Sequence, residues 1–205
     1  MEPLIRPLCP LCGQGNTDFS EDGRCSDCPP GEPWFEAARA SVVFDGMAAV
    51  VVKRLKYSTR EEFAPFMAAR MLDTLAEEYR GRVFDLVVPV PLHRSREGDR
   101  GFNQSLLLAE VIAAGLNLPC HSKALRRIRA TPSQTRLTRD QRANNISGAF
   151  AVSRPLAVRD KRLLLVDDVF TTGATLNECA RMLRAAGAAS VVCLAFARTR
   201  RGDLI

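Results

Sequence analysis

Residues 162–175, RLLLVDDVFTTGAT, constrain the fold more than any other part of this sequence. The run 163–166 is apolar without a break, which is typical of a strand buried on both faces of a parallel sheet. Asp167 and Asp168 follow where such a strand reaches its C-terminal edge, the side on which open α/β sheets bind ligands. A predicted amphipathic helix then ends at Gly187. The stretch therefore predicts an α/β fold with a ligand site at that edge.

The order of strand, acidic pair, small-residue loop and helix indicates the kind of ligand. A loop that opens a helix offers convergent backbone N–H groups and the positive end of the helix dipole, which together bind a phosphate dianion. Adjacent ionised carboxylates accept hydrogen bonds but donate none, which suits the two hydroxyls of a ribose. The ligand implied is a ribose 5-phosphate. The predicted binding residues are Asp167, Asp168, Thr171, Thr172, Gly173, Ala174 and Thr175.

Other strand-loop-helix phosphate sites fit this sequence less well. Neither G-x-x-x-x-G-K-[ST] nor G-x-G-x-x-G occurs, so a P-loop or dinucleotide fold has no support. In phosphoacceptor receiver domains an acidic pair closes the first strand, whereas only 37 residues follow Asp168 here. An Asp pair that merely caps a surface loop would not explain why all four features occur in order. The segment resembles the phosphoribosyl pyrophosphate (PRPP) motif of type I phosphoribosyltransferases.

Length and composition suit one medium-sized core with a small appendage, in a chain of 205 residues. No segment is apolar and long enough to span a membrane, and the N-terminus lacks the layout of a signal peptide. We therefore expect a cytoplasmic protein. Seven cysteines, an odd number, argue against a disulfide framework in such a reducing compartment.

The net charge of +6 is concentrated in one window, residues 93–142. This window holds ten Lys or Arg against four Asp or Glu, while the rest of the chain is balanced at nineteen of each. One interpretation is a solvated basic face. The other is a surface that meets polyanions, either a pyrophosphate, a nucleic acid such as single-stranded DNA, or both.

Two C-x-x-C pairs near the N-terminus predict a metal site. Cys9 and Cys12 form the first pair, Cys25 and Cys28 the second, and twelve residues separate the pairs. Four thiolates make a tetrahedral zinc site with no open position for a substrate, so we expect the zinc to be structural. A redox dithiol is the alternative, but it would need flanking strands that neither pair has.

A Pro-rich stretch, residues 29–33, predicts the boundary between a zinc ribbon at 1–33 and a larger domain at 34–205. Apolar periodicity within the larger domain predicts its elements. Helices are expected at 46–57, 61–79 and 104–116, besides the one ending at Gly187. Strands are expected at 38–46, 84–90, 120–128, 148–152 and 190–197. Lys53, Lys56 and Tyr57 either face a ligand or complement a helix C-terminus.

A cationic loop is predicted after the strand at 84–90. It carries His93, Arg94, Arg96 and Arg100, and in a sheet of this class it lies at the same edge as the acidic pair. Arginine forks suit the oxygens of a pyrophosphate, and a mobile solvated loop is the equal alternative. His93 is either a general acid or a loop residue. A second long polar segment, 129–150, is expected to be a functional lid or disordered.

These motifs together resemble the ComF group of competence proteins, also called ComFC/GntX-like. The matching parts are the four-cysteine ribbon and residues 87–105, 134–150 and 163–175, so the resemblance covers almost the whole chain. It implies a zinc ribbon followed by a type I phosphoribosyltransferase domain that binds PRPP with Mg²⁺. In bacteria competent for transformation it also implies a role with incoming single-stranded DNA and the DNA-uptake machinery.

The resemblance further implies roles for individual residues. The ribose hydroxyls would be bound by Asp167 and Asp168, and the 5-phosphate by residues 171–175. The pyrophosphate loop would contain His93, Arg94 and Arg96. The mobile catalytic loop would contain Arg139, Arg142 and Asn144, which makes the implied catalytic residues Asp167, Asp168, Arg139 and Arg142.

Two classes of function follow from these assignments. The first is an enzyme that displaces pyrophosphate from PRPP by orienting the sugar and stabilising the leaving group, which needs no nucleophilic side chain. The second is a binding protein of DNA uptake that keeps the ligand pocket and uses the basic window as an electrostatic surface. No hood sequence that would select an acceptor base is identifiable, so both classes stay open.

Overall fold

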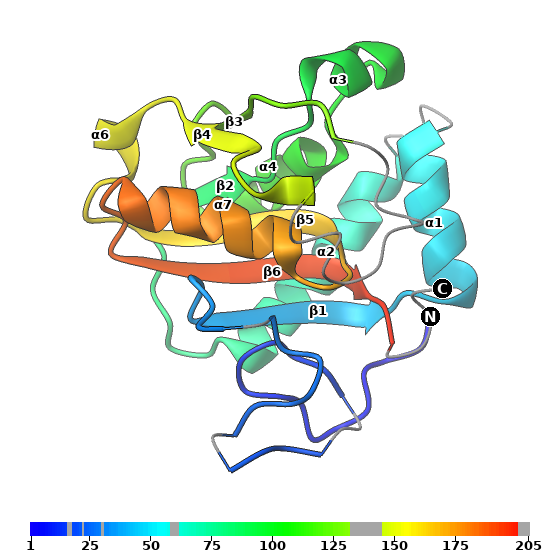
Figure 1. The fold of residues 1–205 in the computed structure, drawn as a ribbon. Helices are drawn as coiled ribbons and strands as arrows, with labels where there is room; N and C mark the ends of the chain where they lie inside the picture. The colour runs from blue at the N-terminus through cyan, green and yellow to red at the C-terminus, as the bar shows by residue number, and fades with distance from the viewer. Residues whose placement is uncertain (16–17, 22, 30, 58–61, 132–144, 201–205) are drawn as a thin grey trace.

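The computed structural model describes residues 1–15, 18–21, 23–29, 31–57, 62–131 and 145–200 (Figure 1). Apart from the N-terminal ribbon, most of this chain is helix and strand. The elements in order are β1 (Ala37–Val43), α1 (Gly46–Tyr57), α2 (Phe63–Glu78), β2 (Leu86–Pro89), α3 (Arg94–Arg100), α4 (Gln104–Leu116), β3 (Leu125–Arg127), β4 (Phe150–Val152), α6 (Pro155–Val158), β5 (Arg162–Phe170), α7 (Ala174–Ala185) and β6 (Ser190–Arg198).

A parallel sheet in the order β1-β6-β5-β2 forms the centre of the molecule. Its inner strands β5 and β6 are almost entirely buried, as the unbroken apolar runs predict. Alternate residues of β5 point into two separate cores. Leu163 and Leu165 pack in the core with α7, and Leu164 and Val166 pack in the core with α1, α2 and α4. Figure 1 accordingly shows α7 on one side of the sheet and α2 and α4 on the other. The predicted α/β class is confirmed.

Two helices match their predictions residue for residue, α1 at 46–57 and α4 at 104–116. The strand prediction at 120–128 is only partly right. Residues 125–127 alone form β3, which pairs antiparallel with β4 rather than with the main sheet. Cys120 makes an isolated parallel bridge to Val87 of β2. Among the helices that the structure describes, each is too short or too polar to cross a bilayer.

The N-terminal ribbon lies along the outer strand β1, where Figure 1 shows it at the edge of the sheet. The backbone N–H of Ala38 donates to the Leu11 carbonyl at 2.7 Å, which continues the hydrogen bonding of β1 into the ribbon. Gly13 has a φ of +69°, and a Cβ there would come within 2.6 Å of the Ala38 carbonyl oxygen. A glycine is therefore needed at this approach. The ribbon's four cysteines belong to the same buried cluster as the α7 face of the sheet.

Candidate ligand site and metal centre

The acidic pair projects from β5 just beyond the end of its neighbouring strand. β2 stops at Pro89, opposite Val166, so the next two residues of β5 have no strand on that side. β5 itself continues past the pair to Phe170 because β6 still pairs with it. Asp167 is 8% exposed, and its Oδ1 accepts from Ser105 Oγ of α4 and from the Asp168 backbone N–H, both at 2.9 Å.

Asp168 has a different set of partners. Its Oδ1 accepts from Gln104 Nε2 at 3.3 Å, and its Oδ2 forms an ion pair with Lys56 Nζ at the end of α1. The side chain is 4% exposed. Burial alone would raise the pKa of Asp168, but the Lys56 charge and the hydrogen bonds outweigh it, so that pKa is lowered. Lys56 therefore faces the site, one of the two interpretations that the sequence left open.

Asp167 has the opposite electrostatic character. Burial raises the pKa of Asp167 to about 7, and the charge of Asp168 adds to this effect. The pair thus combines a carboxylate that stays ionised with one that titrates near neutrality. Because both are held in place by α4, the acceptors are already oriented for hydroxyl donors of a ligand.

Residues 171–175, predicted to bind a phosphate and here called the phosphate loop, run from the end of β5 into the first turn of α7. The N-cap of α7 is Gly173, with a φ of +79°. A Cβ at this position would lie 2.7 Å from Phe170 Cζ and 3.0 Å from Pro29 Cγ. Buried Thr172 accepts from the Ala174 backbone N–H through Oγ1 at 3.4 Å. The loop therefore needs glycine at 173 for both its conformation and its packing.

Gly173→Ala should lower the free energy of unfolding by about 1–3 kcal/mol, because the left-handed conformation and the contact with Phe170 both penalise a Cβ. Urea unfolding measures the change. Gly98→Ala is the matched control, since Gly98 lies within α3 and a Cβ there meets nothing within 4 Å. The packing argument is wrong if both variants unfold at the parent's midpoint.

The predicted cationic loop contains a short helix, α3, which corrects the loop assignment for residues 94–100. His93 caps this helix: its Nδ1 accepts from the Ser95 backbone N–H at 3.3 Å. Arg94 is exposed, and Arg96 Nη2 donates to the Thr131 carbonyl at 2.8 Å. The helix follows β2, so these cations stand at the C-terminal edge of the sheet, as predicted. Arg139, Arg142 and Asn144 lie outside the described residues.

Arg127 lies near the candidate ligand site, although the sequence predicted no role for it in that site. Its Nη2 donates to Thr131 Oγ1, and its guanidinium stands 5.5 Å from the ring centroid of Phe150. Burial lowers the pKa of Arg127, and the charge of Arg96 lowers it further. Two arginines from separate elements thus converge on Thr131. The signal in the sequence was period-two alternation, because Arg127 shares a face of the hairpin with buried Leu125.

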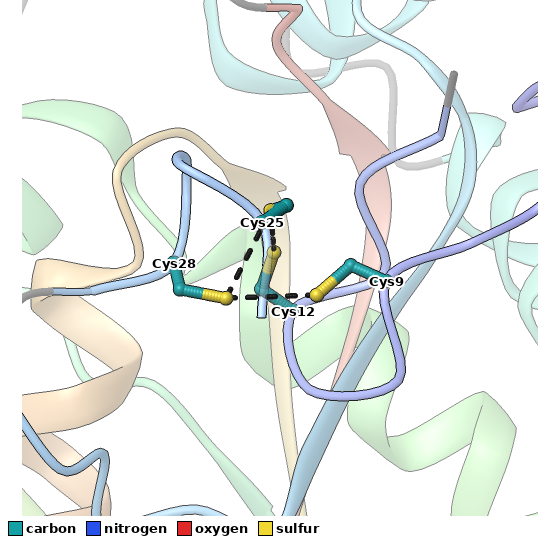
Figure 2. A group of neighbouring side chains, drawn as sticks. All are labelled: Cys9, Cys12, Cys25 and Cys28. Atoms are coloured by element: carbon teal, nitrogen blue, oxygen red, sulfur yellow. Dashed lines mark hydrogen bonds between the residues drawn. The ribbon is translucent and has the colours of Figure 1, made fainter. Parts of the chain in front are cut away.

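The four N-terminal cysteines form the candidate metal centre (Figure 2). All four are buried, and their sulfur atoms lie within 4.8 Å of one another. The separations are 3.5 Å for Cys9–Cys28, 3.4 Å for Cys12–Cys25 and 3.8 Å for Cys25–Cys28. Zinc–sulfur bonds of about 2.3 Å in a tetrahedron place the sulfurs about 3.8 Å apart. The cluster is therefore compatible with a structural zinc ion.

Two of the thiols, Cys12 and Cys28, resist ionisation without a cation. Burial raises the pKa of both, to about 12 for Cys28, whereas at Cys9 backbone hydrogen bonds outweigh burial and lower the pKa to about 7. A bound metal ion reverses that preference, since it deprotonates the thiols that coordinate it. Closed four-thiolate coordination leaves no position for a substrate, which separates this centre from the ligand site.

Comparisons with known proteins place this chain in a family. The family model described as phosphoribosyl transferase domain matches residues 103–204. "DNA utilization protein YhgH" of Salmonella typhimurium is 35% identical over 196 residues, 94% of this chain and 84% of the relative. "Competence protein F" of Haemophilus influenzae is 28% identical, over 94% of this chain and 85% of the relative.

A third relative extends the match to another group of bacteria. "Competence protein ComFC" of Bacillus subtilis is 29% identical over 201 residues, 94% of this chain and 78% of the relative. All three alignments include nearly the whole chain, ribbon as well as sheet. Because one of these relatives is 35% identical over 84% of its length, the chain belongs to the ComF-type family of competence and DNA utilization proteins, which carry a phosphoribosyltransferase domain.

Proposed function

We propose that this protein binds PRPP, or another ribose 5-phosphate nucleotide, and works in DNA uptake or utilization. The observation that carries the proposal is the buried acidic pair held by α4, with the phosphate loop directly after it on the same strand. The three relatives are named as competence and DNA utilization proteins, which supports the proposed role in DNA uptake or utilization.

Each part of the ligand has a proposed partner in the site. Asp167 and Asp168 accept hydrogen bonds from the ribose hydroxyls, and the backbone N–H groups of the phosphate loop bind the 5-phosphate. The pyrophosphate lies toward α3, near His93, Arg94 and Arg96. Arg139 and Arg142 are proposed to complete the site from the second long polar segment.

Mg²⁺ is proposed to enter with the ligand. Among the described residues, the group of three or more Cys, His, Asp or Glu side chains close enough to hold a metal is the cysteine cluster. Mg²⁺ takes oxygen ligands in an octahedron and is commonly held by substrate phosphates with one or two carboxylates. The acidic pair supplies carboxylates of that kind next to the proposed pyrophosphate position. The ion would neutralise charge on the pyrophosphate.

Turnover of PRPP is a second activity that the same site supports. Arg96 and Arg127 converge on Thr131, and Arg127 interacts electrostatically with Asp167, so positive charge gathers where a leaving pyrophosphate would accumulate negative charge. Calorimetric titration with PRPP tests the binding proposal, and the absence of binding would refute it. Release of pyrophosphate against a panel of purine, pyrimidine and amine acceptors separates an enzyme from a binding protein.

The cysteine cluster is proposed to hold a structural zinc ion in the cytoplasm. No disulfide bond joins the cysteines that the structure describes, and Cys120, Cys179 and Cys193 lie outside the cluster. Free thiols persist in a reducing compartment. The proposed location agrees with a role in processing DNA after it has entered the cell.

The basic window is proposed as the surface for single-stranded DNA. Lys123 and Arg126 are exposed on or beside the β3–β4 hairpin, whereas Arg127 is turned inward. Binding to a labelled oligonucleotide should weaken steeply with salt, with a log-log slope of about −0.7 for each phosphate neutralised. Lys123→Gln with Arg126→Gln should flatten the slope by about 0.7 per lost contact. Fluorescence anisotropy across salt concentrations measures this.

A matched double variant controls for the change in net charge. Arg80→Gln with Lys161→Gln removes two exposed cations that lie outside the basic window, before β2 and β5 begin. This control should keep the parent's slope. Equal slopes in all three proteins, or no binding at low salt, would rule out a DNA role for the window.

A further inference from the structure

Arg198, the last residue of β6, connects the cysteine cluster to the body of the sheet. It is 2% exposed. Its Nη1 donates to the Cys12 carbonyl at 2.9 Å, its Nη2 to Cys12 Sγ at 3.4 Å and its Nε to Gln14 Oε1 at 2.5 Å. An arginine buried to this degree needs anionic surroundings. A zinc ion with four thiolates keeps a net negative charge, which a guanidinium donating to Cys12 would balance.

The other face of the Arg198 guanidinium lies on Phe170, the last residue of β5. The guanidinium carbon stands 4.1 Å from the Phe170 ring centroid, a close cation–π contact. Phe35 packs edge-on against the same ring, with centroids 6.4 Å apart. The backbone N–H of Thr199 donates to the Phe170 carbonyl at 3.1 Å. The position of Phe170 is therefore set by residues next to the cysteine cluster.

The Phe170 ring in turn supports the phosphate loop. Gly173 sits so close to it that a Cβ would lie 2.7 Å from Phe170 Cζ. The second support of Gly173 is Pro29, whose Cγ would be 3.0 Å from that Cβ and which directly follows the ligand Cys28. Two routes thus join the cluster to the loop, one through Arg198 and Phe170 and one through Pro29.

We infer that Arg198 and Phe170 are positioning residues through which the metal-bound cysteine cluster fixes the phosphate loop, so that loss of zinc weakens binding of the 5-phosphate. The inference rests on the proposed function of that loop. With the metal bound, Cys12 and Cys28 are held in place, and both supports of Gly173 are held with them. Without it, the two cysteines are released and the loop loses the geometry that its N–H groups need.

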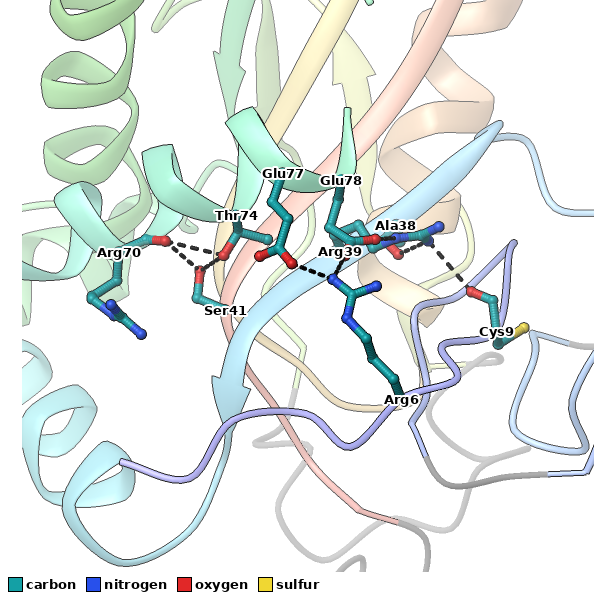
Figure 3. Close-up of polar contacts among 9 residues, drawn as sticks. All are labelled: Arg6, Cys9, Ala38, Arg39, Ser41, Arg70, Thr74, Glu77 and Glu78. Carbon is teal, nitrogen blue, oxygen red and sulfur yellow. Dashed lines mark hydrogen bonds and ion pairs between the residues drawn. The ribbon is translucent and has the colours of Figure 1, made fainter. Parts of the chain in front are cut away.

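Arg39 provides a matched control for this link (Figure 3). Like Arg198, it holds the ribbon by main-chain carbonyls: its Nη1 donates to Pro10 O at 3.1 Å and to Cys9 O at 3.4 Å. Its Nε donates to Glu78 of α2 at 3.0 Å. Arg39 lies on β1, and its contacts lead to α2 rather than to Phe170. Arg39→Gln therefore loosens the attachment of the ribbon at Cys9 and Pro10 but leaves both supports of Gly173, Phe170 and Pro29, in place.

The test compares Arg198→Gln and Arg39→Gln by three measurements on the full chain. Zinc affinity by chelator competition should fall roughly tenfold or more in Arg198→Gln, as for other groups that hold metal ligands. Hydrogen exchange should accelerate in residues 171–185, and PRPP affinity should fall in parallel. Arg39→Gln should leave exchange in residues 171–185 and PRPP affinity at the parent's values. The inference is overturned if the two variants change the loop equally or not at all.

Phe170→Leu tests the same link if Arg198→Gln does not fold. This variant keeps every cysteine and the hydrogen bonds of Arg198 but removes the ring beneath Gly173. It should retain one zinc ion per chain while exchange in residues 171–185 accelerates and PRPP binds more weakly. Parent-like exchange and affinity in this variant would overturn the inference.

Exchange measured on the parent with and without zinc separates the two proposals. If zinc removal leaves exchange in residues 171–185 and PRPP affinity unchanged, the link is refuted while PRPP binding stands. If the parent binds no PRPP yet zinc removal accelerates exchange in residues 171–185, the proposed function fails, and the coupling between cluster and loop is still demonstrated.

Discussion

Protein carrying Asp167→Asn and Asp168→Asn together will bind PRPP roughly a hundredfold or more weakly than the parent, because hydrogen bonds to charged acceptors contribute about 1.5–3 kcal/mol each. The fold should survive. Each amide keeps an oxygen where Ser105 and Gln104 donate, so the buried hydrogen bonds of the pair to α4 are retained. Lys56, which loses its ion-pair partner, is partly exposed and can turn toward solvent. Isothermal titration calorimetry measures the loss.

The control for this double variant is Asp73→Asn, which neutralises an exposed carboxylate on α2. It should bind PRPP with the parent's affinity. Circular dichroism of all three proteins checks that the fold is retained. Parent-like affinity in the double variant would show that the acidic pair does not bind the ribose.

The second large effect that we expect is the unfolding of the N-terminal ribbon when the metal is lost. The parent should contain one zinc ion per chain, and Cys12→Ser should contain almost none, because apparent zinc binding to four-ligand peptides is worth about 10–16 kcal/mol near pH 7 and depends on every ligand. Without zinc, residues 1–33 should exchange their amide hydrogens as an unfolded chain does. Elemental analysis and hydrogen exchange measure the two results.

The core formed with α1, α2 and α4 should remain protected in Cys12→Ser, because its buried residues are separate from the cluster that contains the cysteines. Cys120→Ser is the matched control, since Cys120 is a free thiol outside the metal centre. It should keep its zinc. A parent without zinc, or a Cys12→Ser protein with a full ion, would contradict the assignment of the metal centre.

Sequence patterns predicted the elements whose residues have a strong apolar period. The central strand and the helices α1 and α4 are of this kind. Helix α3 was missed because RSREGDR has no apolar face and contains a glycine. His93 caps the helix through a local hydrogen bond, which the apolar period of a sequence does not report.

The residues of the candidate site also fall into two groups, those that the sequence predicts and those that it does not. The acidic pair and the phosphate loop are contiguous, so their order alone was enough to predict them as a ligand site. Lys56 and Arg198 act on partners that are distant in sequence: Lys56 pairs with Asp168, and Arg198 donates to residues 184 and 186 positions away. Such contacts are set by the topology of the sheet, which places the end of β6 against the ribbon. A single sequence carries no local signal for them.

Strand β5 separates the two cores, and this position explains why the pKa values of its two neighbouring aspartates are shifted in opposite directions. Successive side chains of a strand point to opposite faces, so adjacent carboxylates enter different surroundings. One meets the ammonium of Lys56 and stays anionic, and the other carries a proton through part of the neutral range. A shift of β5 by one residue would move every one of its side chains to the opposite face, including the apolar residues that pack in the two cores. The packing of those apolar residues therefore determines which of the two carboxylates stays ionised.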